Sequence, residues 1–241
     1  DCGPHITWRE ASVGGEPDEA AALPAVGTTR ETSDAIIDRC VELLAGGGIV
    51  AIKGLGGFHL ACDASNEQAV AELRRRKRRS NKPLAVMVRD LADAERLCHV
   101  NDVARGLLAG SIRPIVLLRR RAACESGGSP DALALAPSVA HDLPELGVML
   151  PYTPLQHLLL AAAEARGMHA LVMTSGNLSE EPIETDDGLA WEHLVAAGIA
   201  DALLGNDRAI LSRYDDSVAR VVDGAVMPVR RARGYAPQPL P

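Results

Sequence analysis

The residues whose types and spacing point most clearly to chemistry form a basic segment, Arg74 to Lys82. Seven of its nine residues are lysine or arginine, in a chain whose formal net charge is −7 at pH 7. Cations suit the end of a helix, which explains some of these charges but hardly all of them. Like charges packed together repel unless an anion relieves them. Because arginine offers a forked donor and lysine a compact charge, the segment predicts binding of a polyphosphate.

Two short loops are further candidates for ligand binding. Thr174-Ser175-Gly176-Asn177 follows an apolar run, and loops after strands are where α/β folds place ligands. From the tetrapeptide alone, a plain turn remains the favoured interpretation. The glycine loop after Lys53, residues 54–57, would let a ligand approach the backbone, or it is a tight turn. It is neither a P-loop nor a dinucleotide fingerprint, since no Ser or Thr follows Lys53 and His59 replaces the last glycine.

The last third of the chain carries a mixed set of charges. Two acidic groups beside arginines are either surface ion pairs or a site for Mg²⁺ and phosphate, and their spacing does not decide between these. The set comprises Arg213, Asp215, Asp216, Ser217, Arg220, Arg230, Arg231 and Arg233.

Composition and motifs exclude several other functions. The acidic balance and 2% aromatic content argue against a general nucleic-acid coat. The sequence shows no apolar run of about 20 residues and no signal peptide, so no membrane association is expected. The five cysteines stand far apart, which indicates a reduced, cytoplasmic protein. The seven histidines lack the spacing of metal ligands. The absence of Gly-x-Ser-x-Gly argues against a serine hydrolase, and the lack of a basic motif beside Cys62 and Cys98 argues against a thiolate nucleophile.

The elements that must position these residues alternate between helix and strand, which predicts an α/β fold with a mixed sheet. Helices are expected at 34–45 after Ser33, from Ser65 into the basic segment, at 91–98 and 101–109, from Thr153-Pro154, and after Thr185. Strands are expected at 49–53, 84–88, 115–118, 147–150, 171–174, 201–204, 217–222 and 226–230. Residues 9–31 and 122–144 lack a pattern and are predicted to be loops. The Pro-rich end reads as a linker.

The motifs taken together resemble a known family. Lys77-Arg78-Arg79 and Ser175-Gly176-Asn177 look like the paired K-x-R and S-x-N signature of YrdC-like proteins, and residues 54–64 look like the loop after their first core strand. Residues 147–154, 215–218 and 230–237 narrow the resemblance to the YrdC-like domain of HypF-type carbamoyltransferases. It covers about residues 33–237. We therefore expect a leader at 1–32, this domain at 33–233 and a linker at 234–241 within a longer protein.

The resemblance implies a fold, a reaction and partners. The fold is an open, twisted mixed sheet flanked by helices, with a concave basic cleft. ATP with Mg²⁺ reacts there with carbamate, giving carbamoyl-adenylate and pyrophosphate. In the full-length relatives an acylphosphatase domain supplies carbamate, and a carbamoyl-transfer domain passes the carbamoyl group to HypE for the cyanide ligands of [NiFe]-hydrogenase. Cys2-Gly3-Pro4 resembles the tail of an upstream zinc finger, so Cys2 is expected to be a Zn²⁺ ligand whose partners precede it.

The resemblance also assigns residues. Lys77, Arg79 and Lys82 are expected to bind the phosphates as catalytic residues, and Lys82 precedes Pro83 at the edge of a strand. Ser175 and Asn177 are expected at the α-phosphate and the nucleotide. The remaining expected nucleotide contacts are Lys53, Gly56, Gly57, Arg220 and Arg231.

Some positions depart from the pattern of relatives. Ser80 follows Arg79, where many relatives have proline, and Met149-Leu150 stands where threonine-using relatives have arginine before the strand-end proline. Gly54 and Gly56 stand where those relatives have hydroxyl residues, which favours a substrate smaller than threonine, such as carbamate. A threonylcarbamoyl-adenylate synthase and an RNA-binding module remain the alternatives, the latter weakened by the scarcity of aromatic stacking platforms.

Overall fold

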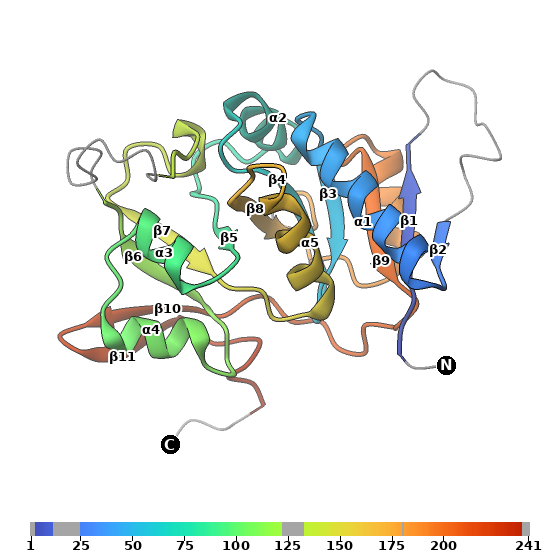
Figure 1. Ribbon diagram of the computed structural model, residues 1–241. Coiled ribbons are helices and arrows are strands. Elements are labelled where there is room, and N and C mark those ends of the chain that lie inside the picture. The colour runs from blue at the N-terminus through green and yellow to red at the C-terminus, as the bar shows by residue number, and fades with distance from the viewer. Residues whose placement is uncertain (1–2, 12–24, 122–132, 180, 238–241) are drawn as a thin grey trace.

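The structure is a computed structural model that describes residues 3–11, 25–121, 133–179 and 181–237. One twisted, open sheet of eleven strands runs through the molecule (Figure 1) in the order β11-β10-β6-β7-β5-β8-β4-β3-β9-β1-β2. The strands are β1 (Ile6–Glu10), β2 (Ala25–Gly27), β3 (Val50–Lys53), β4 (Phe58–Asp63), β5 (Val86–Val88), β6 (Ile115–Arg119), β7 (Glu145–Met149), β8 (Ala170–Ser175), β9 (Ala202–Asn206), β10 (Val218–Val222) and β11 (Ala225–Arg230).

The sheet is mixed, as predicted. The pairs β3–β9, β5–β7 and β6–β10 are parallel, and the other neighbouring pairs are antiparallel. The helices are α1 (Arg30–Ala45), α2 (Glu67–Lys77), α3 (Leu91–Leu97), α4 (Asp102–Ala109), α5 (Pro154–Glu164) and α6 (Asp187–Ala190). A π-helical segment, η2 (Trp191–Ala196), continues α6, and a short 3₁₀ turn, η1 (Pro137–Val139), lies in the predicted loop at 122–144.

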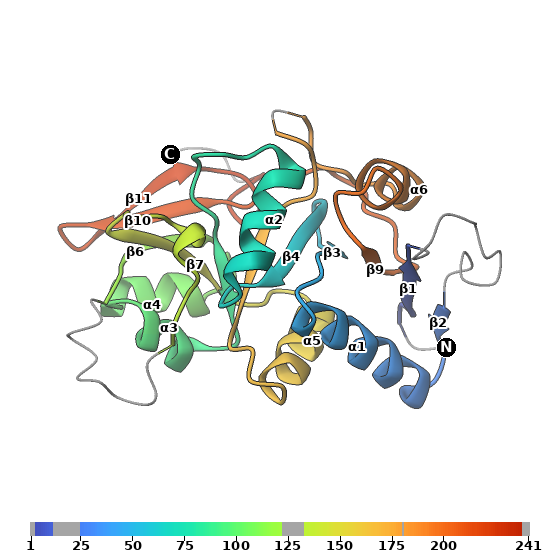
Figure 2. The ribbon, with the colours of Figure 1, turned by 90° about the horizontal axis from the view of Figure 1, so that it is seen from above.

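Two apolar layers cover opposite faces of the sheet because buried strand residues alternate between them. One layer packs α1 and α5 against side chains such as Val50, Ile52 and Met173. The other packs α2, α3, α4 and η2 against side chains such as Ala51 and Leu60. Figure 2 shows α1 and α5 on one side of β3, β4 and β9, with α6 on the other. The core is built almost wholly from aliphatic side chains, in line with the composition.

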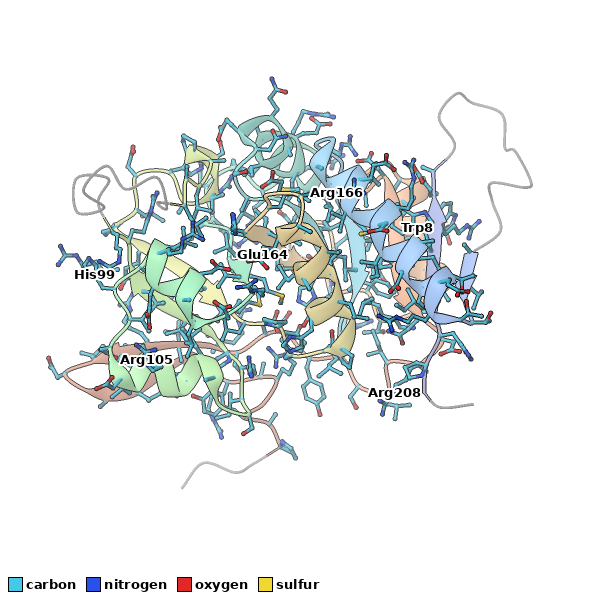
Figure 3. The ribbon with its side chains drawn as sticks, viewed as in Figure 1. Trp8, His99, Arg105, Glu164, Arg166 and Arg208 are labelled. Carbon is cyan, nitrogen blue, oxygen red and sulfur yellow. The ribbon has the colours of Figure 1, made fainter. Side chains whose placement is uncertain are left out.

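The first strands correct one expectation. Residues 9–31 were predicted to be a loop, but β1 ends at Glu10, β2 lies at 25–27 and α1 already begins at Arg30. β1 pairs with β9, and Trp8 packs into the layer beneath α1 (Figure 3). β1 has only two large apolar residues, Ile6 and Trp8, and so short a run gives little periodic pattern to recognise. The division at residue 33 stays a prediction, with strands on both sides of it in one sheet.

Three helix caps also differ from the predicted residues. The caps are Thr29, Asn66 and Asp186, whereas the sequence predicted Ser33, Ser65 and Thr185. In each case a second residue able to cap stands within one turn, and sequence does not tell which side chain meets the free N–H groups. The cap of α5 is as predicted, with Thr153 at the N-cap, Pro154 following it and a reciprocal bond to Gln156.

Candidate functional site

A cavity of about 620 Å³ lies on the sheet face that carries α1 and α5. Its lining includes Ile115 and Leu117 of β6, Gly147 of β7 and Met173 of β8. Met173 belongs to the apolar layer under α1 and α5, and Ile115 packs against that layer. The cavity therefore continues the same face of the sheet beyond the two helices.

Polar residues reach this cavity from separate parts of the chain. Arg79 comes from the segment after α2, and Ser175 and Asn177 come from the end of β8. Arg213 precedes β10, and Arg230 is the last residue of β11. The structure thus brings together three predicted residues, Arg79, Ser175 and Asn177, and two arginines of the C-terminal set.

The guanidinium of Arg79 is held by the chain beside it. Its Nη2 donates to the carbonyl of Pro83 at 2.9 Å, and its Nε points to the carbonyl of Lys82 at 3.4 Å. Burial lowers the pKa of Arg79, and the charges of Arg74 and Arg230 lower it further. Arg79 and Arg230 are therefore close enough to repel each other, and an anion bound between them would relieve this repulsion.

Arg213 and Arg230 belong to the C-terminal set of charges noted in the sequence, but they were not among the residues expected to contact the nucleotide. Neither makes an ion pair with a carboxylate in the part of the chain that the structure describes. Arg230 lies opposite Val218 in the β10–β11 ladder, which places it at the cavity, because Val218 also lines it. The sequence predicted both strands, but it did not tell which arginine would line the cavity.

Lys77 lies behind the cavity wall and does not line it. It is the last residue of α2 and is 1% exposed. Its Nζ donates at 2.6 Å to the carbonyls of Ser175 and Asn177 and at 2.6 Å to Oδ1 of Asn177. The predicted K-x-R and S-x-N residues are therefore joined to each other. The hydroxyl of Ser175 donates to the same Oδ1 at 2.8 Å.

The rest of the basic segment is used within the protein. Arg74 is buried. Its guanidinium donates to the backbone carbonyl of Lys82, at the end of the basic segment, and to that of Ser138 in η1. Arg75 and Arg76 pair with Glu72 one turn earlier, and Arg76 also pairs with Asp201. Part of the charge cluster thus has intramolecular partners that the sequence did not reveal.

The remaining predicted contacts lie away from the cavity lining. Lys82 is exposed, and Lys53 is 2% exposed, with its Nζ 2.6 Å from Asp187. Arg220 pairs with Glu145, and Arg231 lies with its guanidinium 5.7 Å from the centre of the Tyr235 ring.

Gly56 and Gly57 belong to a loop that packs against other parts of the chain. A Cβ on Gly56 would lie 2.5 Å from the carbonyl oxygen of Tyr214, and one on Gly57 would lie 2.5 Å from Cγ1 of Ile183. These contacts explain the glycines without a ligand. Gly56 lines a neighbouring cavity of about 370 Å³, which Arg233 also lines.

A buried polar cluster supports the inner wall of the main cavity. Asp216 accepts from Nε of Arg233 at 2.9 Å, and its other oxygen lies 2.8 Å from Nε2 of His59. Burial alone would raise the pKa of Asp216, but His59 and Arg233 outweigh it and hold the pKa well below 3.8. The guanidinium of Arg233 lies 3.5 Å from the centre of the Tyr152 ring, and burial raises the pKa of Tyr152. Asp216 is therefore a fixed anion at the cavity.

Other kinds of site find little support. Among the described residues, no group of three or more His, Cys, Asp or Glu side chains is placed to hold a metal ion. Cys2 lies outside the described residues. Cys40, Cys62 and Cys98 are free and buried, and burial raises the pKa of the Cys98 thiol to about 12, which disfavours a thiolate nucleophile. No helix in the described part is long and apolar enough to cross a membrane.

Comparisons of the sequence and the fold with known proteins identify the family. The family model Sua5_yciO_yrdC, described as "Telomere recombination", matches residues 42–232. Carbamoyltransferase HypF2 of Cupriavidus necator is 48% identical over 234 residues, which cover 91% of this chain and 28% of that protein. Carbamoyltransferase HypF of Rhodobacter capsulatus is 46% identical over 241 residues, which cover 100% of this chain and 28% of that protein.

A solved structure is similar as well. The crystal structure of full-length HypF in the phosphate- and nucleotide-bound form matches with a TM-score of 0.80 and 42% identity, over 99% of this chain and 27% of that chain. The chain thus spans just over a quarter of the length of the curated relatives it matches. By sequence and by fold, the chain belongs to the Sua5/YciO/YrdC family and corresponds to the YrdC-like part of HypF carbamoyltransferases.

Proposed function

We propose that this chain binds ATP in the 620 Å³ cavity and joins it to carbamate, forming carbamoyl-adenylate and releasing pyrophosphate. The observation that carries this proposal is the meeting of Arg79 and Arg230 at a cavity that Ser175 and Asn177 also line. The likeness to HypF carbamoyltransferases, one of them solved with nucleotide bound, supports the choice of reaction.

The reaction asks for positioning and charge neutralisation. A carbamate oxygen attacks the α-phosphorus of ATP, the bond from that phosphorus to the bridging oxygen breaks, and pyrophosphate leaves with the electron pair. No proton has to move, because the nucleophile is already an anion. A site that orients both reactants and offsets the phosphate charge therefore suffices.

The residues at the cavity supply these effects. Arg79, Arg213 and Arg230 would neutralise the phosphates, with Arg79 fixed by its backbone contacts. Ser175 and Asn177 would lie against the α-phosphate and the nucleotide, as the sequence predicts. Lys77 acts from behind this pair. Lys82, Lys53, Arg220 and Arg231 receive no role in this assignment, because they do not line the cavity.

A Mg²⁺ ion would arrive with the nucleotide. Such ions keep several waters and need only one or two protein carboxylates. Asp215 is exposed and lines the cavity, so its carboxylate suits a nucleotide-bound Mg²⁺, whereas both oxygens of Asp216 are already engaged. The ion would supply further neutralisation of phosphate charge.

We further propose that the chain acts within a longer HypF-type protein in the cytoplasm. There an acylphosphatase domain would supply carbamate and a carbamoyl-transfer domain would pass the group to HypE, towards the cyanide ligands of [NiFe]-hydrogenase. A zinc finger that includes Cys2 would precede the sheet. These partners are proposed from the likeness to HypF.

The reaction can be tested directly on the chain. ATP, Mg²⁺ and freshly dissolved ammonium carbamate are incubated with it, and carbamoyl-AMP and pyrophosphate are measured by mass spectrometry and a coupled assay. The proposal expects both products with carbamate and neither with threonine plus bicarbonate. Pyrophosphate release that depends on threonine would instead support a threonylcarbamoyl-adenylate synthase. Binding of ATP without either product would overturn the catalytic assignment, and tight tRNA binding without ATP binding would favour the RNA alternative.

A further inference from the structure

Lys77 has no donor left for a ligand. A lysine ammonium carries three N–H groups, and three oxygens of Ser175 and Asn177 lie 2.6 Å from its nitrogen. The side chain is buried at the end of α2, with 1% of the residue exposed. A direct bond to a phosphate, the role expected from the sequence, would require Lys77 to release one of these oxygens.

These contacts fix the orientation of Asn177. Because lysine can only donate, the amide oxygen of Asn177 must point towards it, and the amide nitrogen must point away. That nitrogen donates to the carbonyl of Glu181, and the hydroxyl of Ser175 donates to the same amide oxygen. One ammonium therefore sets the directions of the side-chain and backbone groups along the 175–177 wall.

The charge of Lys77 has no counterion in the part of the chain that the structure describes. The charged groups near Lys77 on α2 and the segment after it are two cations, Arg74 and Arg79. The oxygens that face Lys77 from β8 and from residues 176–179 belong to neutral groups. Glu181, beyond them, lines the cavity. Burial, together with the nearby charge of Arg79, lowers the pKa of Lys77 to about 7. An anion on the cavity side of the wall would favour the charged form.

We propose that Lys77 is a positioning residue, whose ammonium holds Ser175 and Asn177 in the geometry that binds nucleotide phosphates, so that nucleotide binding and protonation of Lys77 are linked. A neutral amine has two N–H groups and must release one of the three oxygens. Affinity for nucleotide should therefore fall as the pH rises above the point where free Lys77 loses its proton. The linkage rests on the proposed binding of ATP. The contacts of Lys77 with Ser175 and Asn177 do not depend on that proposal.

The sequence makes a direct test practical, because the chain has only three lysines, Lys53, Lys77 and Lys82. Lysine labelled with ¹³C at Cε gives one NMR signal for each, and the signal of Lys77 is the one that Lys77→Met removes. If that variant does not fold, Lys53→Met and Lys82→Met identify the signal by elimination. The midpoint of Lys77 is then measured between pH 6 and 10 with and without ATP·Mg²⁺.

The inference expects the midpoint of Lys77 to rise by about one pH unit or more with nucleotide bound. The backbone amides of Ser175 and Asn177 should follow the same transition in the free protein. In Lys77→Arg, which keeps its charge across this range, the amide transition should vanish. The variant Lys82→Met is the matched control and should leave the transition in place.

The outcomes separate this inference from the proposed function. If ATP binds and the midpoint of Lys77 does not move, the linkage is wrong while the proposed function stands. If the amides of Ser175 and Asn177 do not respond to Lys77, the positioning role is wrong. If ATP fails to bind by calorimetry while the amides still follow Lys77, the proposed function and the linkage fall, and the positioning contacts remain.

Discussion

Arg233 and Asp216 form an ion pair of 2.9 Å in which the two side chains are only 9% and 11% exposed. Asp216 is also bonded to His59, a residue of β4, so the pair ties the C-terminal segment to the centre of the sheet. A buried pair of this kind costs much to break from one side, because the other charge then stays buried without a partner.

The first prediction follows from this pair. Asp216→Asn should destabilise the fold by about 3–5 kcal/mol, since Arg233 would lose its counterion. Because the pKa of Asp216 is held below 3.8, its stabilising contribution is present above that pH and is lost as the pH falls. Urea unfolding from pH 3 to 7 measures both effects, and the variant should lose less stability on acidification than the original chain. Asp215→Asn, at an exposed neighbour, is the control and should unfold like the original.

Arg79→Ala should weaken ATP binding at least tenfold, which corresponds to about 1.4 kcal/mol. The reason is that Arg79 is the residue of the basic segment that lines the cavity. The matched control is Arg75→Ala, which removes the same charge four positions earlier, where the side chain pairs with Glu72. Calorimetry with ATP·Mg²⁺ should separate the two variants. Equal affinities for both would remove Arg79 from the site.

Arg230→Gln tests whether two like charges converge on a polyphosphate. The charge of Arg230 lowers the pKa of Arg79, so the two guanidinium groups repel in the free protein. We expect the variant to bind ATP more weakly and to show less loss of affinity when the salt is raised, because screening acts on the charge removed. Arg166→Gln, an equal change of charge at an exposed turn after α5, should keep the original salt dependence. Identical salt curves for Arg230→Gln and the original chain would count against the proposal.

Arg74 should prove structural. Its guanidinium donates to carbonyls of Arg79, Ser80, Lys82, Ser138 and Val139. Lysine keeps the charge but lacks the fork, so Arg74→Lys should leave buried carbonyls unpaired and cost about 1–3 kcal/mol. Thermal unfolding measures this cost, and Arg75→Lys should leave the midpoint unchanged. A destabilised Arg74→Lys that still binds ATP normally would show that the backbone before Pro83 does not position Arg79.

Sequence patterns located the fold better than they located the site. The predicted strands from 49–53 onwards and the helices near 91–109 are present, because their apolar residues repeat at the spacing of each element. The leader strand β1 was missed, since Trp8 is its one large buried side chain. β4 was missed as well, because residues 54–64 were expected to be a loop.

The basic segment shows why site residues are harder to assign. Successive residues of a helix point about 100° apart, so neighbouring cations at its end face different surroundings. Arg76 meets Asp201, Lys77 meets Asn177 and Arg79 reaches the cavity, and those partners are far away in sequence. Charge density alone predicted a phosphate site, but it assigned the same role to residues that the fold separates.

The pairing of β1 with β9 has a practical consequence for anyone who trims this chain. Residues Ile6–Glu10 cover the backbone of Ala202–Asn206 along its full length. Starting the protein at residue 33 would uncover that apolar ribbon, and unprotected strand edges invite pairing between molecules. Chains shortened in this way should elute as aggregates in gel filtration. A loss of activity in them would then reflect aggregation and not the removal of a catalytic residue.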